Sequence, residues 1–466
     1  MESQLNAASQ PTLSLRDRIG GEVLFPGDPG FEAARQAWNL VTRQSPAVIA
    51  IPTNAEEAAE AVRAARASGL GVAVQTTGHG VIVPADDCML IVTSRLSGVT
   101  VDEATQTAWV GGGSKWQAVL DAAQACGLAP LLGSSPDVGA VGYTLGGGLG
   151  WLSRKYGLGS DSARAFEVVT ADGQIIQAGP DAHPDLFWAL RGGGKGLGIV
   201  TAMQIQLYPL TQVYAGNLFY PPAMAGEVLA RFKTWTAACP DELTASVVLF
   251  NFPPAPALPD FLRGQSFVIV RGCWCGPVAE GEAQLRFWRD WQSPLIDDFK
   301  ALPFSQIAAV SNDPLDPMPS RTTTAWLNQF SEETAQTLIA YSQPGSAPSP
   351  FVFLEVRHCG GAISRQTQRA GAFGNRQSPY LLEGVGFTPA PEAVQAFDLA
   401  SQRLLAAIGT DAASSVYLNF LEGEACWNST ERGFAPYVYR RLQGVKACYD
   451  PEQVFRFGYH IPPARD

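Results

Sequence analysis

Three glycine triplets in the first half of the chain place the strongest constraint on its fold. They lie at residues 111–113, 146–148 and 192–194, each beside a segment with the pattern of a strand or of a helix start. Glycine has no Cβ, so such turns let main-chain N–H groups approach a ligand closely. Tight turns in a compact α/β fold are the alternative explanation for any single triplet. Three together favour a ligand site built from backbone.

The spacing of the glycines excludes two common phosphate-binding loops. No GxGxxG occurs in the 466 residues, which argues against a Rossmann dinucleotide site. Lys195 follows a triplet, but Gly196 comes next in place of Ser or Thr, so the loop is not a Walker A motif. With four histidines and no HExxH, no metal site is expected.

Composition and charge restrict the class of protein. Hydrophobic residues make up 46% of the chain, enough for two or three domains, and the 47 Gly and 34 Pro indicate a turn-rich mixed α/β protein. The net charge is -11 and there is no basic run, so a nucleic acid partner is excluded. No apolar run approaches 18 residues, and residues 1–18 lack the pattern of a signal peptide. We therefore expect no membrane partner and a cytoplasmic protein.

The first 210 residues alternate strand-like and helix-like segments. Residues 47–52 predict a buried strand, and Asn54 followed by Glu57 is typical of a helix start. The helix continues to residue 67, and residues 71–75 predict the second strand of a β-α-β unit. Further strands are predicted at 89–93, 99–102, 106–110, 166–178 (a hairpin turned at Asp172-Gly173) and 199–210, with a helix at 114–125.

The pattern changes near residue 212. Beyond it, proline-rich loops at 253–259, 313–319 and 343–350 separate longer amphipathic stretches. Dense aromatic and basic patterning returns near the C-terminus. We therefore expect a domain boundary near residue 212 and a return of the chain to the first domain after about residue 415.

Five segments, taken in order, resemble one known family. They are VQTTGHG (74–80), GSSPDVGAVGYTLGGGLGWLSRKYGLGSD (133–161), VVTADG (168–173), DLFWALRGGGKGLGIVTAM (185–203) and VKACYDPEQVFRFGYHIPP (445–463). They are similar to segments of the PCMH-type FAD-linked oxidases, and more closely of bacterial members of the berberine bridge enzyme-like branch. The resemblance covers about 35–210 and 350–463, whereas residues 213–345 resemble the family only in length and in general sequence pattern.

The resemblance implies an α+β fold in three segments. Residues 1–212 are expected to form a two-lobed FAD-binding domain of PCMH type. Residues 213–414 are expected to form a substrate-binding domain with an antiparallel sheet backed by helices, and residues 415–466 to return to the FAD domain. FAD would lie between the lobes of the first domain, with the second domain covering its isoalloxazine ring.

The resemblance also assigns the cofactor contacts. It implies that His79 carries the flavin covalently through its 8α-methyl group, which fixes the ring and raises its potential. Many relatives have a second link from a cysteine, but Ser135 stands at that position and cannot form the thioether, so a single link is expected. Upstream of His79, Thr76 and Thr77 stand where glycines are common, and their hydroxyls are expected to donate to the pyrophosphate instead. The residues expected to contact the cofactor are Gln75, Thr76, Thr77, Gly78, His79, Gly80, Gly133, Ser134, Ser135, Val138, Gly139, Gly142, Tyr143, Gly146, Gly147, Gly148, Gly150, Gly198, Ile199, Val200, Tyr459 and His460.

Three residues are candidates for the catalytic base that flavin chemistry needs. If 353–358 is a strand, Glu355 and Arg357 share one face and His358 lies on the other. Burial would raise the pKa of Glu355 towards neutrality, as suits a base, and the alternative is an ion pair with an arginine. Tyr417 is the second candidate, or else a hydrogen-bonded core tyrosine. If 416–420 is also a strand, Tyr417 and Asn419 share one face of it. His358 is the third, or else a satisfied buried polar group.

The sequence thus predicts an FAD-dependent oxidase. Its substrate would be an alcohol, amine or phenolic small molecule, a natural product or a sugar, and molecular oxygen would be the acceptor. Val138 stands where this family is thought to control the approach of oxygen, and a small β-branched side chain there resembles the oxidases. A dehydrogenase with another acceptor and a non-catalytic flavin-binding module are the alternatives.

Overall fold

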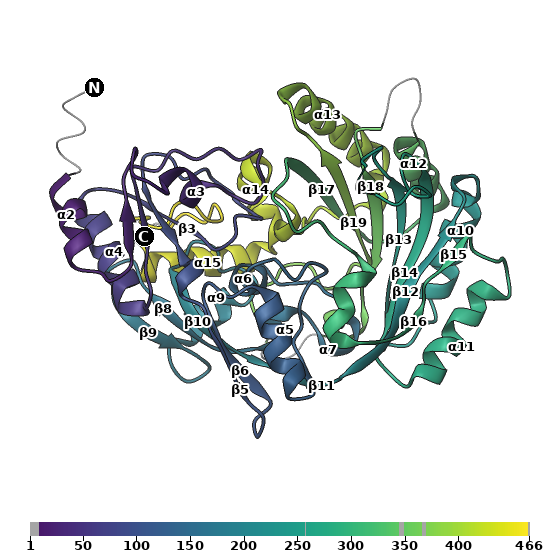
Figure 1. The fold of residues 1–466 in the computed structure, drawn as a ribbon, viewed down its shortest axis with the longest axis horizontal. Helices are drawn as coiled ribbons and strands as arrows, with labels where there is room; N and C mark the ends of the chain where they lie inside the picture. Colours follow the sequence, from purple (N-terminus) through teal and green to yellow (C-terminus); the bar gives the residue numbers. More distant parts are fainter. Residues whose placement is uncertain (1–8, 257, 344–348, 366–369, 465–466) are drawn as a thin grey trace.

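The structure, a computed structural model, describes residues 9–256, 258–343, 349–365 and 370–464. It is an α+β fold in which two domains lie side by side (Figure 1). The first domain contains the N-terminal elements together with α14 and α15 of the C-terminal segment, and the second is built on one large sheet. Within these ranges, no helix is long and apolar enough to cross a bilayer.

The first lobe of the first domain is a small sheet in the order β1-β2-β4-β3. Its strands are β1 (Glu22–Leu24), β2 (Val48–Ile51), β3 (Val72–Gln75) and β4 (Met89–Val92). The predicted β-α-β unit is present, with α4 (Ala55–Ala67) between β2 and β3 and with β4 inserted between the two strands and parallel to both. The Asn54 side chain accepts a hydrogen bond from the Glu57 N–H at 2.9 Å, which caps α4 as its sequence predicts.

The second lobe is a five-stranded sheet in the order β5-β6-β10-β8-β9. Its strands are β5 (Val99–Asp102), β6 (Thr107–Gly111), β8 (Ala163–Val169), β9 (Ile175–Ala178) and β10 (Ile199–Gln206). β8 and β9 form the predicted hairpin. A separate short pair joins β7 (Leu128–Ala129) and β11 (Tyr208–Pro209). The helices of this domain are α2 (Ser9–Leu13), α3 (Phe31–Arg35), α5 (Trp116–Ala125), α6 (Ala140–Leu145), α7 (Ser153–Tyr156), α8 (Gly159–Ser162), α9 (Pro184–Leu190), α14 (Gly423–Ser429) and α15 (Pro436–Tyr449).

The second domain is an antiparallel sheet in the order β15-β12-β14-β13-β18-β19-β17, with β16 also paired to β12. Its strands are β12 (Gln212–Tyr220), β13 (Leu243–Asn251), β14 (Ser266–Trp274), β15 (Ile296–Asp297), β16 (Lys300–Pro303), β17 (Ser320–Leu327), β18 (Phe353–His358) and β19 (Tyr380–Phe387). Four helices cover its outer face (Figure 1): α10 (Ala225–Thr236), α11 (Val278–Arg289), α12 (Glu332–Ser342) and α13 (Pro391–Ala407). The opposite face, called here the inner face, is turned toward the first domain.

Alternation along the strands assigns each side chain to one face of the large sheet. Leu354 and Val356 of β18 belong to the core that the sheet shares with the outer helices. Glu355 and Arg357 therefore lie on the inner face. Cys273 of β14 belongs to the core of the first domain, which extends across to this face, so Arg271 on the same strand lies on the inner face as well.

One expectation about local structure is corrected, and another stays a prediction. The glycine triplets approach protein groups: a Cβ on Gly112 would lie 2.4 Å from the Val200 carbonyl oxygen, and one on Gly192 would lie 2.7 Å from Phe373. Close packing therefore requires these glycines, and the contact of their backbone with a ligand stays a prediction. The segment 416–420 is not a strand but contains a short 3-10 helix (Leu418–Phe420), because no neighbouring strand pairs with it.

Candidate functional site

A cluster of four charged side chains occupies the inner face of the large sheet. Glu355 and Glu383 are direct cross-strand partners on β18 and β19. Arg357 pairs with both, at 3.0 Å from Glu355 Oε2 and 2.8 Å from Glu383 Oε2, and Arg271 lies 3.9 Å from Glu355 Oε1. The Glu355 side chain is only 1% exposed, whereas that of Arg357 is 18% exposed. The cluster thus contains two fixed cations, and Arg357 is its most accessible member.

The expected pKa of Glu355 is wrong. Burial alone would raise it, but the guanidinium groups of Arg357 and Arg271 hold the pKa below its ordinary value. Glu355 is therefore an ion-paired carboxylate, which was the alternative interpretation. Such a group is a poor acceptor for a substrate proton.

Glu383 is the carboxyl group with the pKa that was expected of Glu355. Burial raises its pKa to about 7, with Arg357 opposing the shift and the Glu355 carboxylate adding to it. The sequence interpretation did not single out Glu383. The sequence did contain a feature that could have identified Glu383: it is the one carboxylate in the otherwise apolar strand YLLEGVGF. A charged residue in such a strand faces either solvent or a functional cavity.

His358 is held inside the protein by both ring nitrogens. Its Nε2 lies 3.1 Å from Arg154 Nη1, and its Nδ1 lies 3.5 Å from Cys239 Sγ. Burial lowers the pKa of His358 to about 3, and the Arg154 guanidinium lowers it further. His358 is therefore a neutral acceptor for Arg154, which matches a satisfied buried polar group rather than a catalytic base.

Tyr417 lies among groups that favour its phenolate form. Burial raises its pKa to about 12, but the Asn419 amide, the Arg357 guanidinium and the N–H groups of Leu149 and Gly148 all oppose the shift. Asn419 Nδ2 is 3.4 Å from the Tyr417 hydroxyl and donates at 2.9 Å to the Tyr143 carbonyl oxygen. Tyr417 and Asn419 are thus adjacent, as expected, although the segment is not a strand.

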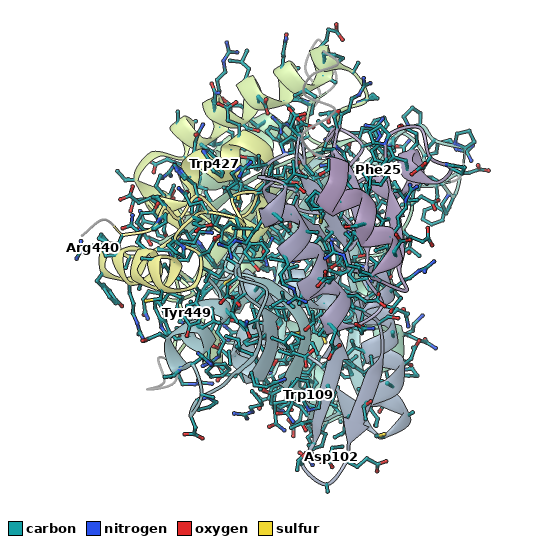
Figure 2. All side chains as sticks on the ribbon, turned by 90° about the vertical axis from the view of Figure 1, so that its left-hand side faces the viewer. Phe25, Asp102, Trp109, Trp427, Arg440 and Tyr449 are labelled. Atoms are coloured by element: carbon teal, nitrogen blue, oxygen red, sulfur yellow. The ribbon has the colours of Figure 1, made fainter. Side chains whose placement is uncertain are left out.

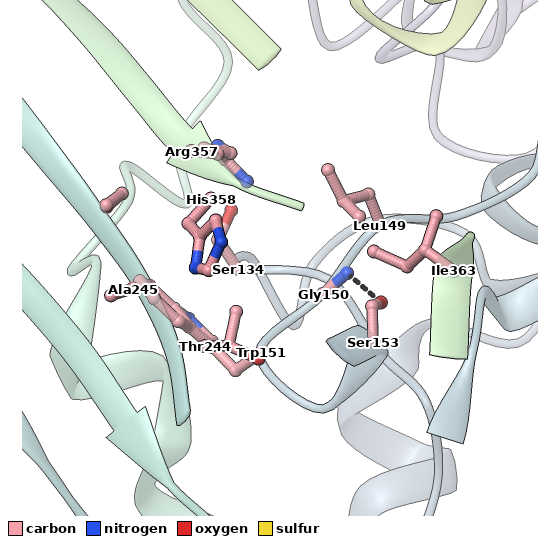
Figure 3. Close-up of a pocket in the computed structure, with 11 residues that line it drawn as sticks. Ser134, Leu149, Gly150, Trp151, Ser153, Thr244, Ala245, Arg357, His358 and Ile363 are labelled. Atoms are coloured by element: carbon pink, nitrogen blue, oxygen red, sulfur yellow. Dashed lines mark hydrogen bonds between the residues drawn. The ribbon is translucent and has the colours of Figure 1, made fainter. Parts of the chain in front are cut away.

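A small cavity joins the glycine-rich turns to the inner face (Figure 3). Its volume is about 20 Å³, room for about one water molecule. Arg357 and His358 lie on one side of it, and Leu149 and Gly150 lie across from them. Ser134 also lines the cavity, so the loop that contains Ser135 reaches the second domain. The full set of lining residues is Ser134, Leu149, Gly150, Trp151, Ser153, Thr244, Ala245, Ser246, Arg357, His358 and Ile363.

His79 lies in a defined setting after β3. Its ring stacks on Trp38, with centroids 4.3 Å apart and planes 16° from parallel. Its Nδ1 lies 2.8 Å from Thr77 Oγ1, while its Nε2 is buried and has no hydrogen-bond partner among the described residues. Burial lowers the pKa of His79 to about 4, with Asp137 opposing the shift and Lys115 adding to it. His79 is therefore neutral at physiological pH.

A half-buried cation lies close to His79. A Cβ built on Gly80 would be 3.6 Å from Lys195 Nζ, and this ammonium lies 5.5 Å from the centroid of the Tyr459 ring. Burial lowers the pKa of Lys195, and no carboxylate pairs with it in the part of the chain that the structure describes. In the sequence, Lys195 stands out only because it follows the third glycine triplet. That no carboxylate of the described residues pairs with it can be seen only in the structure.

The residues here fit a large anionic cofactor such as FAD. Buried polar atoms without partners in the described ranges include His79 Nε2, the hydroxyls of Tyr143 and Tyr459, and Asn419 Oδ1. The main-chain N–H groups of residues 78–80 also meet no acceptor in those ranges. Buried polar groups are normally satisfied, so this set indicates a polar ligand. Backbone donors and the Lys195 ammonium match the chemistry of a diphosphate.

Several predicted contact residues have other partners. The Gln75 side chain bonds to Gln44 and to the Gln36 carbonyl oxygen. The Thr76 hydroxyl bonds to Thr93 and the Gly112 carbonyl oxygen, and that of Thr77 to His79, so neither threonine hydroxyl is free for a pyrophosphate as expected.

Other predicted contacts pack in the core or lie on the surface. The side chains of Ile199 and Val200 are in the cores of the two lobes. An added Cβ would contact the Tyr143 ring at Gly133, Gly148 and Gly159, and the Leu132 carbonyl oxygen at Gly150. It would contact Thr76 at Gly139, Asn419 at Gly146, Phe373 at Gly147 and Val168 at Gly198. Gly142 has open space at its Cβ position. His460 is exposed and stacks on Trp427 at 4.2 Å; Trp427 is labelled in Figure 2. The structure thus brings His79, Gly80, Tyr143, Tyr417 and Tyr459 toward one region and leaves His460 outside it.

Comparisons with known proteins agree with this geometry. Residues 46–179 match the FAD binding domain family. The chain is 30% identical over 461 residues to (R)-6-hydroxynicotine oxidase of Paenarthrobacter nicotinovorans, covering 96% of this chain and 97% of that one. The crystal structure of 6-hydroxy-D-nicotine oxidase from Arthrobacter nicotinovorans matches with a TM-score of 0.83 at 25% identity, over 96% and 98% of the two chains. The glucooligosaccharide oxidase of Acremonium strictum, whose FAD is 6-S-cysteinyl and 8α-N1-histidyl, matches with a TM-score of 0.83 at 20% identity, over 98% and 100%.

Proposed function

Because the chain belongs to the PCMH-type FAD-linked oxidases of the vanillyl-alcohol oxidase superfamily, we propose that it oxidises a small molecule using FAD linked covalently to His79 alone. One observation carries the proposal. Polar atoms that belong to candidate cofactor contacts, His79 Nε2, the hydroxyls of Tyr143 and Tyr459 and Asn419 Oδ1 beside Tyr417, are buried without a partner in the described ranges.

The first domain holds the cofactor. Main-chain N–H groups of residues 78–80 and the Lys195 ammonium bind its anionic groups, and Tyr143, Asn419 and Tyr459 donate to or accept from its polar edges. Ser135 offers no thiol, so His79 is the single attachment point.

The second domain presents the substrate. FAD supplies the hydride acceptor of the reaction when it is bound. Tyr417 is the proposed base: as a phenolate it would take the proton from the hydroxyl or amine of the substrate at its Oη. Burial raises its pKa to about 12, so this role depends on the Asn419 amide, Arg357 and two backbone N–H groups, which favour the phenolate. Arg357 supplies the nearby positive charge, and Glu355 keeps Arg357 in place through their ion pair. The substrate is an alcohol, an amine or a phenolic compound, because each couples loss of a C–H hydride to loss of an acidic proton.

Oxygen is the proposed acceptor. Val138 is a half-buried residue in the loop before α6 that packs against the core of the first domain, and we infer from its small side chain that it does not block oxygen. An enzyme that passes its electrons elsewhere would reoxidise slowly in air. A non-catalytic flavin-binding module would not be reduced at all.

Anaerobic reduction tests the proposal. The purified flavoprotein is mixed without oxygen with representative alcohols, amines, phenols and oligosaccharides, and the flavin absorbance is followed. Bleaching by at least one class, followed by recovery and hydrogen peroxide release when oxygen is admitted, supports the oxidase. Bleaching with slow recovery in air supports a dehydrogenase. A flavin that no compound reduces, while dithionite does, contradicts a catalytic role.

A further inference from the structure

Five phenylalanine side chains form a continuous aromatic surface on the inner face of the large sheet, called here the aromatic wall. Phe250 on β13 and Phe353 on β18 are direct cross-strand partners whose ring centroids lie 5.6 Å apart. Phe252 stacks on Phe250 with centroids 4.1 Å apart, and its ring lies 6.0 Å from that of Phe267 on β14. Phe267 in turn lies 5.6 Å from Phe219 on β12. The rings therefore make one chain of contacts across four neighbouring strands.

The aromatic wall is not part of the core of either domain. Leu249 and Leu354 are the sequence neighbours of Phe250 and Phe353, and both belong to the core under the outer helices, so the two phenylalanines point to the inner face. All five side chains of the wall are half-buried, and within the described ranges none is a member of the hydrophobic cores. A continuous apolar surface that stays partly exposed is typical of a binding site.

The register of the sheet places the aromatic wall next to the charged cluster. β13 and β18 lie side by side in the second domain (Figure 1). Phe353, Glu355 and Arg357 stand at successive inner-face positions of β18, and their cross-strand partners on β13 are Phe250, Val248 and Ser246. At about 3.3 Å per residue, Phe353 lies about 7 Å from Glu355 and about 13 Å from Arg357 along the strand. The inner face thus changes from charged to aromatic within the length of a small molecule.

The proposed base lies at the charged end of this surface. The Arg357 guanidinium lies 5.1 Å from the centroid of the Phe420 ring, and that ring lies 4.8 Å from the ring of Tyr417. Tyr417 is therefore separated from Arg357 by a single side chain. A substrate whose reacting group is at Tyr417 can extend along β18 toward Phe353.

We propose that the aromatic wall binds the body of the substrate, which carries two or more aromatic rings joined to the hydroxyl or amine that is oxidised. The inference rests on the proposed oxidase function and names the substrate class of the same site. A molecule with its reacting group near Tyr417 must cover about 7 to about 13 Å to reach Phe353, which is more than one ring spans. Phe250 and Phe353 are the specificity-determining residues, because they form the part of the wall that continues the strand of Arg357 and its direct partner.

The chemistry of the aromatic wall discriminates against sugars. Phe267, Phe250 and Phe353 occupy one row across the sheet, and Val385 on β19 continues it. None of these four side chains donates or accepts a hydrogen bond. The hydroxyls of an oligosaccharide would be buried there without partners, which is unfavourable. An aromatic ring gains apolar burial and edge-to-face or offset contacts at the same place.

Anaerobic reduction of the holoenzyme by a graded ring series tests the inference. Benzyl alcohol, naphthalenemethanol and biphenylmethanol, together with the corresponding amines, are compared with cellobiose by stopped flow. The half-saturating concentration should fall by about tenfold or more from one ring to two, because the second ring buries its apolar surface on the wall. Equal half-saturation by one-ring and two-ring compounds, or tighter saturation by cellobiose, would overturn the inference and leave the oxidase function standing.

Variants of the aromatic wall locate the effect. Phe250→Ala and Phe353→Ala should each remove most of the gain from the second ring. Tyr437→Ala is the control, because it truncates an aromatic side chain that is 69% exposed on α15 of the first domain, and it should retain the gain. A gain that survives in both wall variants would place the rings elsewhere and overturn the assignment. If the wall variants do not fold, the ring series of the wild type still decides the substrate class.

Calorimetric titration of the oxidised holoenzyme with naphthalenemethanol separates this inference from the proposed function. Binding that weakens by about tenfold in Phe353→Ala, without reduction of the flavin, would support the aromatic wall and count against the oxidase function. No binding to the wild type would overturn the inference. A wild-type dimer that Phe267→Ser converts to a monomer would place a second copy of the chain on the wall and would also overturn it.

Discussion

Replacing Glu383 with glutamine should stabilise the protein above neutral pH. The pKa of this buried carboxyl is raised from its ordinary value of 4.5 to about 7. Between these values the unfolded chain releases the proton while the folded chain keeps it. The unfolded state then binds fewer protons, so wild-type stability falls as the pH rises through this window.

The size of the effect follows from the pKa. At about 1.4 kcal/mol for each tenfold change in proton affinity, the penalty is about 3 kcal/mol at pH 8 and below about 1 kcal/mol at pH 5. Glutamine has the shape of the protonated carboxyl and does not ionise, so Glu383→Gln removes this penalty. With an unfolding entropy of about 2.1 cal/mol/K per residue, about 3 kcal/mol raises the melting temperature of the whole chain by about 3 °C.

Thermal melting of the holoenzymes at pH 5 and pH 8 measures this difference. Glu355→Gln is the matched control of opposite sign, because the pKa of Glu355 is lowered and its ionised form stabilises the fold above its unfolded pKa. That variant should melt below the wild type at pH 8, leaving Arg271 and Arg357 less well compensated. A Glu383→Gln protein that is no more stable than the wild type at pH 8, or whose gain is the same at both pH values, would refute the reasoning.

Three further substitutions probe the site. Tyr417→Phe should retain the flavin and reduce the rate of anaerobic flavin reduction by about 10²-fold or more, as expected for loss of a proton acceptor; a near-wild-type rate in stopped flow would exclude Tyr417 as the base. Lys195→Met removes the unpaired cation near Gly80 and should lower the flavin midpoint potential or the bound flavin content; wild-type values for both would place Lys195 outside the cofactor site. Val138→Leu should slow reoxidation by oxygen and leave turnover with an artificial acceptor intact, whereas equal losses with both acceptors would argue against a path for oxygen at Val138.

Much of the fold follows from local sequence patterns. The Asn54 cap, the Asp172-Gly173 hairpin and the strands of the first two sheets other than β1 depend on residues a few positions apart, and the structure places them close to where their sequence predicts. β1 (Glu22–Leu24) was not predicted. The segment 416–420 has the alternation of a strand but lacks a pairing partner, and a strand needs one. That partner is a property of the whole fold, so alternation alone predicted the wrong element.

The electrostatics of the site could not be predicted from the sequence. Glu355 has a lowered pKa because Arg271, 84 positions earlier, and Arg357 both reach it from strands of one sheet. Glu383 has a raised pKa because it is buried, and because the Glu355 carboxylate, which shares Arg357 with it, raises the pKa further. The resemblance to known oxidases identifies His79 as a candidate site residue. Its stacking on Trp38 could not be predicted, because Trp38 lies in a loop about 40 residues earlier in the chain.

Acid precipitation of the purified protein tests the central claim most directly. The account predicts that flavin absorbance stays with the washed, redissolved pellet of the wild type and of Ser135→Ala, and that it is lost from the pellet of His79→Ala. This pattern would establish one covalent link, through the histidine. A yellow supernatant over a colourless wild-type pellet would contradict the covalent link, and flavin that stays in the pellet of His79→Ala would contradict attachment through the histidine alone.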